Sequence, residues 1–145
     1  MKIEALFENW GRDSIIDDIN LDTASLDVPK LHAKYLRIFF DDKMRMQKYE
    51  ADFQVLKREK YVFYTEGHTQ ETRDKGWELP PRGAIIKSEV QIYLDSDPDI
   101  ITASLKLSQQ KEKVAVLKDI ISNINYRHIT IKNIMEYRKW SQGAG

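Results

Sequence analysis

The chain has 145 residues, of which 32% are charged and 41% are hydrophobic, so its length suits one domain with a modest core. Its 23 Lys and Arg residues balance 23 Asp and Glu residues, and this zero net charge excludes a globally basic nucleic-acid-binding protein. The absence of cysteine excludes a disulfide framework, a thiolate zinc site and a cysteine nucleophile.

Neither a signal peptide nor a membrane helix is indicated. Glu4 and Glu8 interrupt the N-terminal segment, which has no apolar run. The longest apolar stretches, such as residues 38–40, are far shorter than the roughly 20 residues of a membrane helix. We therefore expect a cytoplasmic protein with no membrane contact.

Charge is distributed unevenly along the chain. Residues 1–27 hold two basic and seven acidic residues, whereas residues 28–60 hold nine basic and five acidic ones. The zero net charge therefore conceals an acidic N-terminal arm beside a basic segment. Two interpretations stay open: the basic segment is a set of solvated helix faces, or it forms a surface that binds a polyanion.

The N-terminal part of the chain predicts short helices. Apolar residues recur at helical spacing in residues 1–10, and Gly11 favours a helix end there. Residues 12–27 are rich in Asp, Ser, Thr and Asn, with isoleucines among them. This composition permits a second short helix before residue 28.

A long helix is predicted next. Asp27 and Pro29 suit the cap and first turn of a helix, and no further Gly or Pro occurs until after residue 65. Apolar residues recur every three or four positions, which predicts a helix of nearly forty residues, roughly 55 Å long. Such a helix needs partners along its length, either from the same chain or from an oligomer.

The pattern breaks after this helix. Residues 66–84 contain four turn signals, which predict a mobile connection. Residues 85–94 fit either a strand or a helix, and the helix is slightly favoured.

The rest of the chain predicts two helices. Asp97 suits a helix cap and Pro98 a first turn, and the apolar spacing that follows is close to a heptad repeat. We expect this helix to end near residues 123–127. Thr130 is then expected to cap a final helix.

Catalytic motifs are absent from the sequence. It has no Walker-type phosphate loop, no dinucleotide fingerprint and no nucleophile elbow. Its histidines lack metal-site spacing, and the Asp95–Asp99 stretch lacks the glycine and glutamate of a calcium loop. We therefore expect no enzyme activity, no metal and no cofactor, and we keep a small metal-dependent nuclease as the least favoured alternative.

The segment from Leu56 to Tyr64 combines three basic residues with three aromatic ones. Single-stranded nucleic acid is bound by cations that follow the phosphates and by aromatic faces that stack on bases. Arg58 and Tyr61 share a helix face, whereas Arg58 and Lys60 point about 200° apart. From these residues alone, a DNA-binding stretch and an ordinary helix end with buried aromatics are equally open.

A series of short motifs carries a family resemblance across most of the chain. The motifs are His32-Ala33-Lys34-Tyr35-Leu36, Met46, Glu50-Ala51, Arg58, Lys60, Phe63-Tyr64-Thr65, Lys87-Ser88-Glu89, Leu94, Asp97, Ile131-Lys132, Ile134 and Arg138. In the order and spacing of these motifs the chain resembles the UvsY recombination mediator proteins of T4-like bacteriophages.

The resemblance implies a protein that binds single-stranded DNA and forms a ring-like homo-oligomer. Such a protein helps a phage recombinase to displace the single-strand-binding protein during recombination-dependent replication and repair, in the cytoplasm of the infected bacterium. The family's DNA-binding motif is leucine, lysine, any residue, arginine and leucine. Arg58 and Lys60 match its two basic positions, whereas Lys57 and Tyr61 stand where leucines are expected.

Two sets of candidate site residues follow. The predicted DNA-binding residues are Lys57, Arg58, Lys60, Tyr61 and Tyr64, with Lys43, Arg45 and Lys48 earlier in the long helix. The resemblance places oligomerisation in the C-terminal region, where the candidates are Val114, Leu117, Ile121, Ile124, Ile131, Ile134 and Trp140.

The predicted fold is mainly α, a bundle of long helices that assembles into a ring. Residues 1–66 form an N-terminal helical region with the DNA-binding helix, residues 67–84 a flexible connection, and residues 85–145 a helical oligomerisation region. The alternative function is a helical, oligomeric adaptor that binds only proteins, for which Arg58 and Lys60 would be unimportant.

Overall fold

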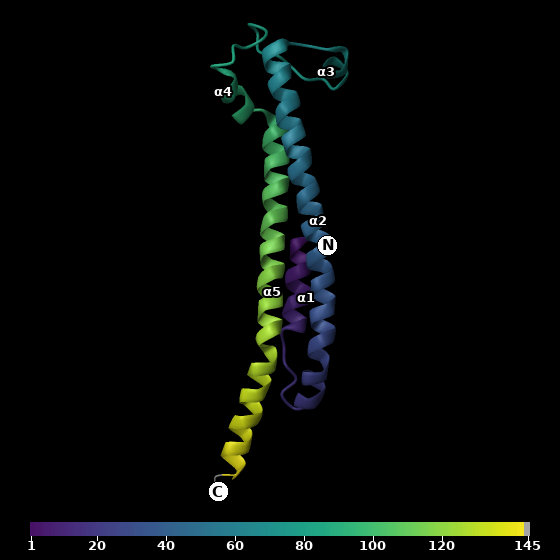
Figure 1. Ribbon diagram of the computed structural model, residues 1–145, viewed down its shortest axis with the longest axis vertical. Coiled ribbons are helices and arrows are strands. Elements are labelled where there is room, and N and C mark those ends of the chain that lie inside the picture. The colour runs from purple at the N-terminus through teal and green to yellow at the C-terminus, as the bar shows by residue number, and fades with distance from the viewer. Residues whose placement is uncertain (144–145) are drawn as a thin grey trace. The chain divides into compact units, whose positions relative to one another are not determined.

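The computed structural model describes residues 1–143, and every regular element in them is a helix. The helices are α1 (Ile3–Asp13), α2 (Leu21–Glu66), α3 (Gln70–Asp74), α4 (Val90–Asp95) and α5 (Pro98–Gly143), as Figure 1 shows. The mainly α fold is confirmed, and residues 85–94 form turns and the start of α4 rather than a strand. No helix in this part of the chain is long and apolar enough to cross a bilayer.

The chain forms two compact units, and each combines segments that are far apart in the sequence. Unit 1 comprises residues 1–43 and 112–145, and unit 2 comprises residues 44–111. The long helices α2 and α5 each contribute one part to unit 1 and another part to unit 2. The units therefore cut across the division at residues 66 and 85 that the turn signals favour.

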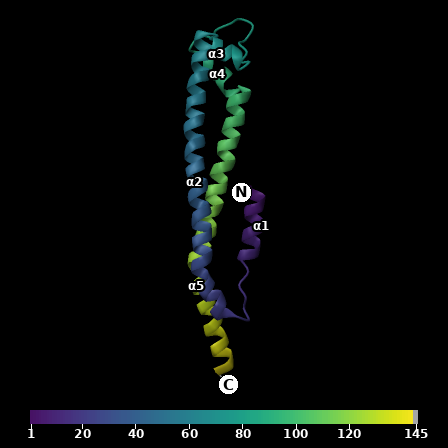
Figure 2. The ribbon, with the colours of Figure 1, turned by 90° about the vertical axis from the view of Figure 1, so that its right-hand side faces the viewer.

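Unit 1 is held together by a core shared between three helices. Leu6 of α1, Tyr35 of α2 and Leu117 and Ile124 of α5 are fully buried in one cluster. The Trp10 ring meets the Tyr35 ring edge-on, with centroids 5.5 Å apart. Figures 1 and 2 show the result: α1 lies along one side of the pair formed by the first part of α2 and the last part of α5.

The predicted start of α2 at Asp27–Pro29 is wrong, because the helix already begins at Leu21 and contains Pro29. Leu21 and Ala24 are buried against Ile131 of α5, and this burial stabilises the two additional turns. Proline in a helix interior leaves the carbonyl four residues earlier without its usual donor, and this costs stability. That carbonyl belongs to Ser25, an exposed residue, so water can bind it.

The predicted break near residues 123–130 is also wrong, because α5 is continuous from Pro98 to Gly143. No glycine or proline lies between these two ends. Thr130 does not cap a new helix; its hydroxyl lies 3.5 Å from the Tyr126 carbonyl inside α5. Ile131 is buried against Leu21 and Ala24 of α2, and this burial favours continuation of the helix past residue 130.

Gly11 does not end the first helix, which continues to Asp13. The end of α1 is instead bound by a side chain from α5. The buried Arg127 guanidinium donates to the carbonyls of Asp13 and Ile15, both at 2.9 Å. These bonds satisfy carbonyl groups that a helix end leaves free.

Unit 2 contains the end of α2, the start of α5, and the short helices α3 and α4 with their connections (Figure 1). Its core consists of Phe63, Tyr64, Val90, Leu94 and Ile100. Gly67 closes the end of α2 with a φ of 91°, and its amide donates to the Phe63 carbonyl at 2.9 Å. The cap at Asp97 is confirmed, since its carboxylate accepts from the Asp99 and Ile100 amides at 2.9 and 3.0 Å.

Candidate nucleic-acid interface

Lys60, one of the predicted DNA-binding residues, is buried. Its side chain is 4% exposed, and its Nζ lies 2.8 Å from Asp99 Oδ2 and 3.1 Å from Asp97 Oδ2. The same ammonium lies 4.0 Å from the centre of the Trp77 ring, a cation–π contact. In this fold Lys60 is enclosed by its own chain and presents no charge to solvent.

Tyr64 is buried beside Lys60 and belongs to the same network. Its hydroxyl donates to Asp97 Oδ2 at 2.6 Å. Burial, followed by this hydrogen bond, raises the pKa of Tyr64 well above its usual value. Burial also acts to raise the pKa of Asp97, but hydrogen bonds from Tyr64, the Ile100 amide and Lys60 outweigh it and hold that pKa below 3.8. The charged Asp97 carboxylate therefore connects α2 to the start of α5 within unit 2.

These contacts concern two of the predicted DNA-binding residues. The polar groups of Lys60 and Tyr64 are bound inside unit 2. The remaining members of the stretch, Lys57, Arg58 and Tyr61, are all exposed. The helical period accounts for part of this separation, since Arg58 and Lys60 point about 200° apart around the helix. Lys60 and Tyr64, four residues apart, share the buried face, and Arg58 and Tyr61 share an exposed one.

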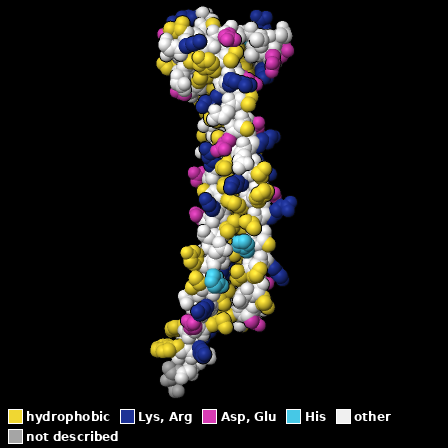
Figure 3. Space-filling view, in the orientation of Figure 1, with side chains coloured by type: hydrophobic (Ala, Val, Ile, Leu, Met, Phe, Trp, Pro, Cys, Tyr) yellow, Lys and Arg dark blue, Asp and Glu magenta, His cyan; other side chains and the backbone are white. Residues whose placement is uncertain are grey.

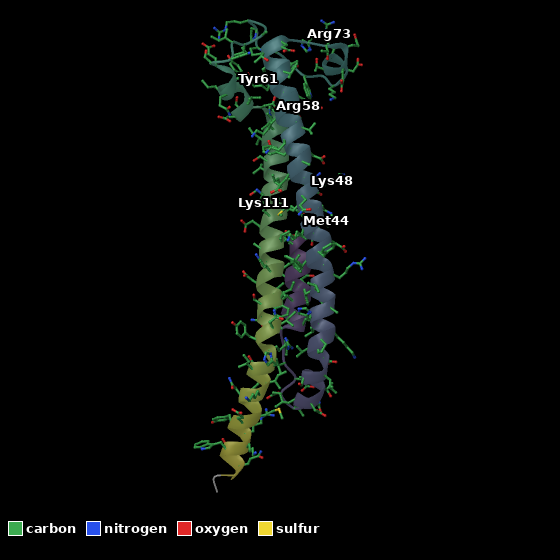
Figure 4. The ribbon with its side chains drawn as sticks, viewed as in Figure 1. Met44, Lys48, Arg58, Tyr61, Arg73 and Lys111 are labelled. Carbon is green, nitrogen blue, oxygen red and sulfur yellow. The ribbon has the colours of Figure 1, made fainter. Side chains whose placement is uncertain are left out.

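The part of α2 in unit 2 has one face that is turned away from the core. This outer face consists of exposed residues spaced by four and three: Met44, Lys48, Ala51, Val55, Arg58 and Val62. Within residues 1–143, neither Lys48 nor Arg58 has an ion-pair partner. Their Cα atoms are separated by ten residues, roughly 15 Å along the helix. Figure 4 marks both residues on α2.

Aromatic and apolar groups accompany these cations. Tyr61, three residues after Arg58, is 37% exposed, and Lys57 lies over the Phe53 ring at 5.3 Å from its centre. Next to Lys57, a cavity of about 270 Å³ opens between α2, α4 and α5; its lining residues are Phe53, Lys57, Gln91, Leu94, Asp95, Ile100, Ile101, Ser104 and Leu105. Of the Tyr61 and Phe53 rings only that of Tyr61 is exposed, and an exposed ring close to a cation such as Arg58 suits a base with its phosphate.

Other cations of unit 2 differ in whether they contact a carboxylate or an aromatic ring. Lys111 pairs with Glu50 at 3.5 Å, and Lys106 lies over the Tyr49 ring at 4.3 Å. Arg73 on α3 is exposed and has no ion-pair partner in the described part of the chain. Nothing in the sequence around Arg73 distinguishes it, because this connection shows only turn signals.

Lys43 and Arg45, the remaining predicted DNA contacts, fall on either side of the boundary between the units. Both side chains are exposed. In unit 1, the Lys43 ammonium lies 5.8 Å from the centre of the Phe39 ring. Arg45 belongs to unit 2. Both stay candidates, with less support than Lys48 and Arg58.

Three of the seven predicted oligomerisation residues are buried in the interior of unit 1. Leu117, Ile124 and Ile131 are at most 2% exposed and pack against α1 and α2 of the same chain. Val114, Ile121 and Ile134 are half-buried. Trp140 differs, since it is 70% exposed beside Tyr137, which is 68% exposed. Figure 3 shows hydrophobic side chains on the surface of the last turns of α5.

No group of three His, Asp or Glu side chains in residues 1–143 is arranged to hold a metal ion. The carboxylates near the basic stretch serve as helix cap and ion-pair partners. The exposed residues in this part of α2 provide positive charge and an aromatic surface.

Comparisons with known proteins agree on one family. The model of the family described as "Recombination, repair and ssDNA binding protein UvsY" matches residues 9–144. No curated protein matches the sequence.

Three similar solved structures are crystal forms of the bacteriophage T4 recombination mediator protein UvsY. Lattice type II is 24% identical with a TM-score of 0.80, covering 100% of this chain and 99% of that one. Lattice type I is 22% identical with a TM-score of 0.79, covering 94% and 98%. Lattice type IV is 20% identical with a TM-score of 0.78, covering 97% and 99%. At these identities the likeness shows a shared fold.

Proposed function

Because the chain belongs to the UvsY family of recombination, repair and single-stranded DNA-binding proteins, we propose that it is a recombination mediator that binds single-stranded DNA. The family is one of DNA-binding mediators rather than of enzymes. The role in recombination and repair agrees with the family match over almost the whole chain and with the shared fold.

The observation that carries the proposal is the exposed pair Arg58 and Tyr61. Arg58 has no ion-pair partner among residues 1–143, and Tyr61 follows it by one helical turn. Lys48 lies on the same outer face and also has no ion-pair partner in the described part of the chain. Lys57, next to Arg58 in the sequence, is exposed as well. We assign phosphate contacts to Lys48, Lys57 and Arg58 and base stacking to Tyr61.

The finer role is the loading of a phage recombinase onto DNA that is covered by single-strand-binding protein. Several copies of the chain in a ring would repeat the outer face of α2, and weak binding by each copy would combine into strong binding. We place the contacts between copies at the exposed aromatic end of α5, including Tyr137 and Trp140. The buried residues Leu117, Ile124 and Ile131 maintain each copy's own fold.

DNA binding is tested by fluorescence anisotropy of a labelled oligodeoxythymidine over a series of salt concentrations. We expect binding that weakens steeply with salt, because each neutralised phosphate releases counterions. Arg58→Ala should weaken binding and reduce the slope of log K against log salt by about 0.7. Tyr61→Ala should weaken binding and leave that slope unchanged, since stacking releases no counterion.

Lys118→Ala is the matched control, because it removes an exposed cation of α5 that lies in unit 1. Equal losses for Arg58→Ala and Lys118→Ala would contradict a specific site on α2. If the wild-type protein does not bind DNA at low salt, the proposal fails and the protein-only adaptor takes its place. Cleavage of the DNA when magnesium is added would instead favour a nuclease.

A further inference from the structure

The environment of Lys60 differs from that of every other cation in the predicted DNA-binding stretch. Its ammonium is flanked by Asp97 and Asp99 at 3.1 and 2.8 Å and covered by the Trp77 ring at 4.0 Å. Lys57 and Arg58, by contrast, are exposed. A phosphate would reach the Lys60 ammonium only after both ion pairs had opened and the side chain had left the core.

The partners of Lys60 come from three different segments of unit 2. Lys60 lies on α2, Asp97 and Asp99 lie at the start of α5, and Trp77 lies in the connection after α3. Lys60 therefore joins the α2 turn that carries Arg58 and Tyr61 to the start of another helix and to a loop. Tyr64 reinforces the same junction through its 2.6 Å hydrogen bond to Asp97.

We propose that Lys60 is a positioning residue for DNA binding: it fixes the turn of α2 that presents Arg58 and Tyr61, and it does not contact the DNA. The inference rests on the proposed function, since it concerns how the same surface binds single-stranded DNA. It assigns the two basic positions of the family's motif different tasks, contact for Arg58 and support for Lys60.

The proposal predicts a pattern that a DNA contact cannot produce. Removing one member of a buried ion pair leaves an uncompensated charge, whereas replacing both members with neutral residues of similar shape is much less harmful. The loss caused by Lys60→Met should therefore be repaired by Asp97→Asn in the same chain. Asparagine can still cap α5, and the half-exposed Asp99 carboxylate can be solvated.

The experiment measures oligodeoxythymidine affinity over a salt series for wild type, Lys60→Met, Asp97→Asn and the double variant. The titrations are run at a temperature at which circular dichroism shows every variant fully folded, so that a purely structural role leaves the affinity unchanged. We expect Lys60→Met to weaken binding about tenfold with an unchanged salt slope. The double variant should recover most of the affinity.

Arg58→Met is the matched control, because it exchanges an exposed cation of the same stretch for the same neutral side chain. It should reduce the salt slope by about 0.7, and Asp97→Asn should not restore its affinity. If the wild type binds DNA and Arg58→Met binds it equally well, the DNA-binding surface does not include Arg58.

Two results would overturn the positioning role. One is a fall of about 0.7 in the salt slope for Lys60→Met that Asp97→Asn does not repair, because Lys60 would then contact a phosphate. The other is an unchanged affinity of fully folded Lys60→Met, which would reduce Lys60 to a structural residue. Absence of DNA binding by wild type would reject the proposed function and this inference with it.

Discussion

Residues of the same chemical type serve different purposes in this protein according to their burial. Arg58 and Lys60 are two positions apart, yet one is exposed and the other is 3% exposed between two carboxylates. Lys113 is similarly buried in unit 1, where it lies 3.0 Å from Asp42. A positive charge in the sequence therefore does not by itself identify a DNA contact.

Asp97 makes the stability of the protein depend on pH. Its pKa is below 3.8 in the folded state, so the unfolded chain takes up the proton first as the pH falls. The stabilisation is fully present above about pH 5 and is lost as the pH falls through the folded-state pKa. We expect Asp97→Asn to flatten the decline in unfolding free energy below about pH 4, measured by urea denaturation.

Asp119→Asn is the control for this pH dependence. Asp119 is exposed and has no ion-pair partner in residues 1–143, so the variant makes the same chemical change outside the network. Its pH profile should match that of wild type, including the contribution of Asp13, whose pKa is also held below its usual value. Identical profiles for all three proteins would contradict the role of Asp97.

At the scale of elements, burial overrides local signals for where a helix starts and stops. Helix α2 contains Pro29 and α1 contains Gly11, although each of these residues favours a helix boundary. In both helices the flanking apolar residues are buried against α5. At the end of α2 the residues that follow Gly67 are exposed, and there the local signal of the glycine prevails.

Gly11 and Gly67 should respond in opposite ways to replacement by alanine. Gly11 lies in a helix, and an added Cβ would meet nothing within 4 Å, so Gly11→Ala should stabilise the protein by ~0.5–1 kcal/mol. Gly67 has a φ of 91°, which alanine adopts only with strain, so Gly67→Ala should lower the free energy of unfolding. Urea denaturation of both variants gives the comparison, and a stabilising Gly67→Ala would contradict the role of its left-handed conformation.

At the scale of the whole molecule, apolar side chains fall into an internal set and an exposed set. The residues of the internal set, such as Ile131, are buried by contacts within unit 1. The exposed set includes Tyr126, Met135, Tyr137 and Trp140 on α5. The heptad-like spacing between Ile100 and Ile124 falls mainly on residues that are buried within the chain, so such spacing does not by itself indicate a contact with another copy.

Variants of the two sets should therefore separate assembly from folding. Trp140→Ser should lower the mass measured by light scattering at a given protein concentration, because it removes an exposed aromatic surface. Ile131→Ala should lower the free energy of unfolding by ~2–5 kcal/mol, because it leaves a cavity in unit 1. An unchanged mass for Trp140→Ser would place the contact between copies elsewhere.

The helical class, the main part of α2, the Asp97 cap and, through the motifs, the family are all predictable from the sequence. These features depend on residue spacing and local chemistry, which a linear sequence displays directly. The burial of Lys60 and Tyr64, the exposure of Arg58 and Tyr61, and the uninterrupted course of α2 and α5 become visible only in the folded chain. The reason is that burial of Lys60 depends on Trp77, Asp97 and Asp99, which approach it only after the chain has folded back on itself.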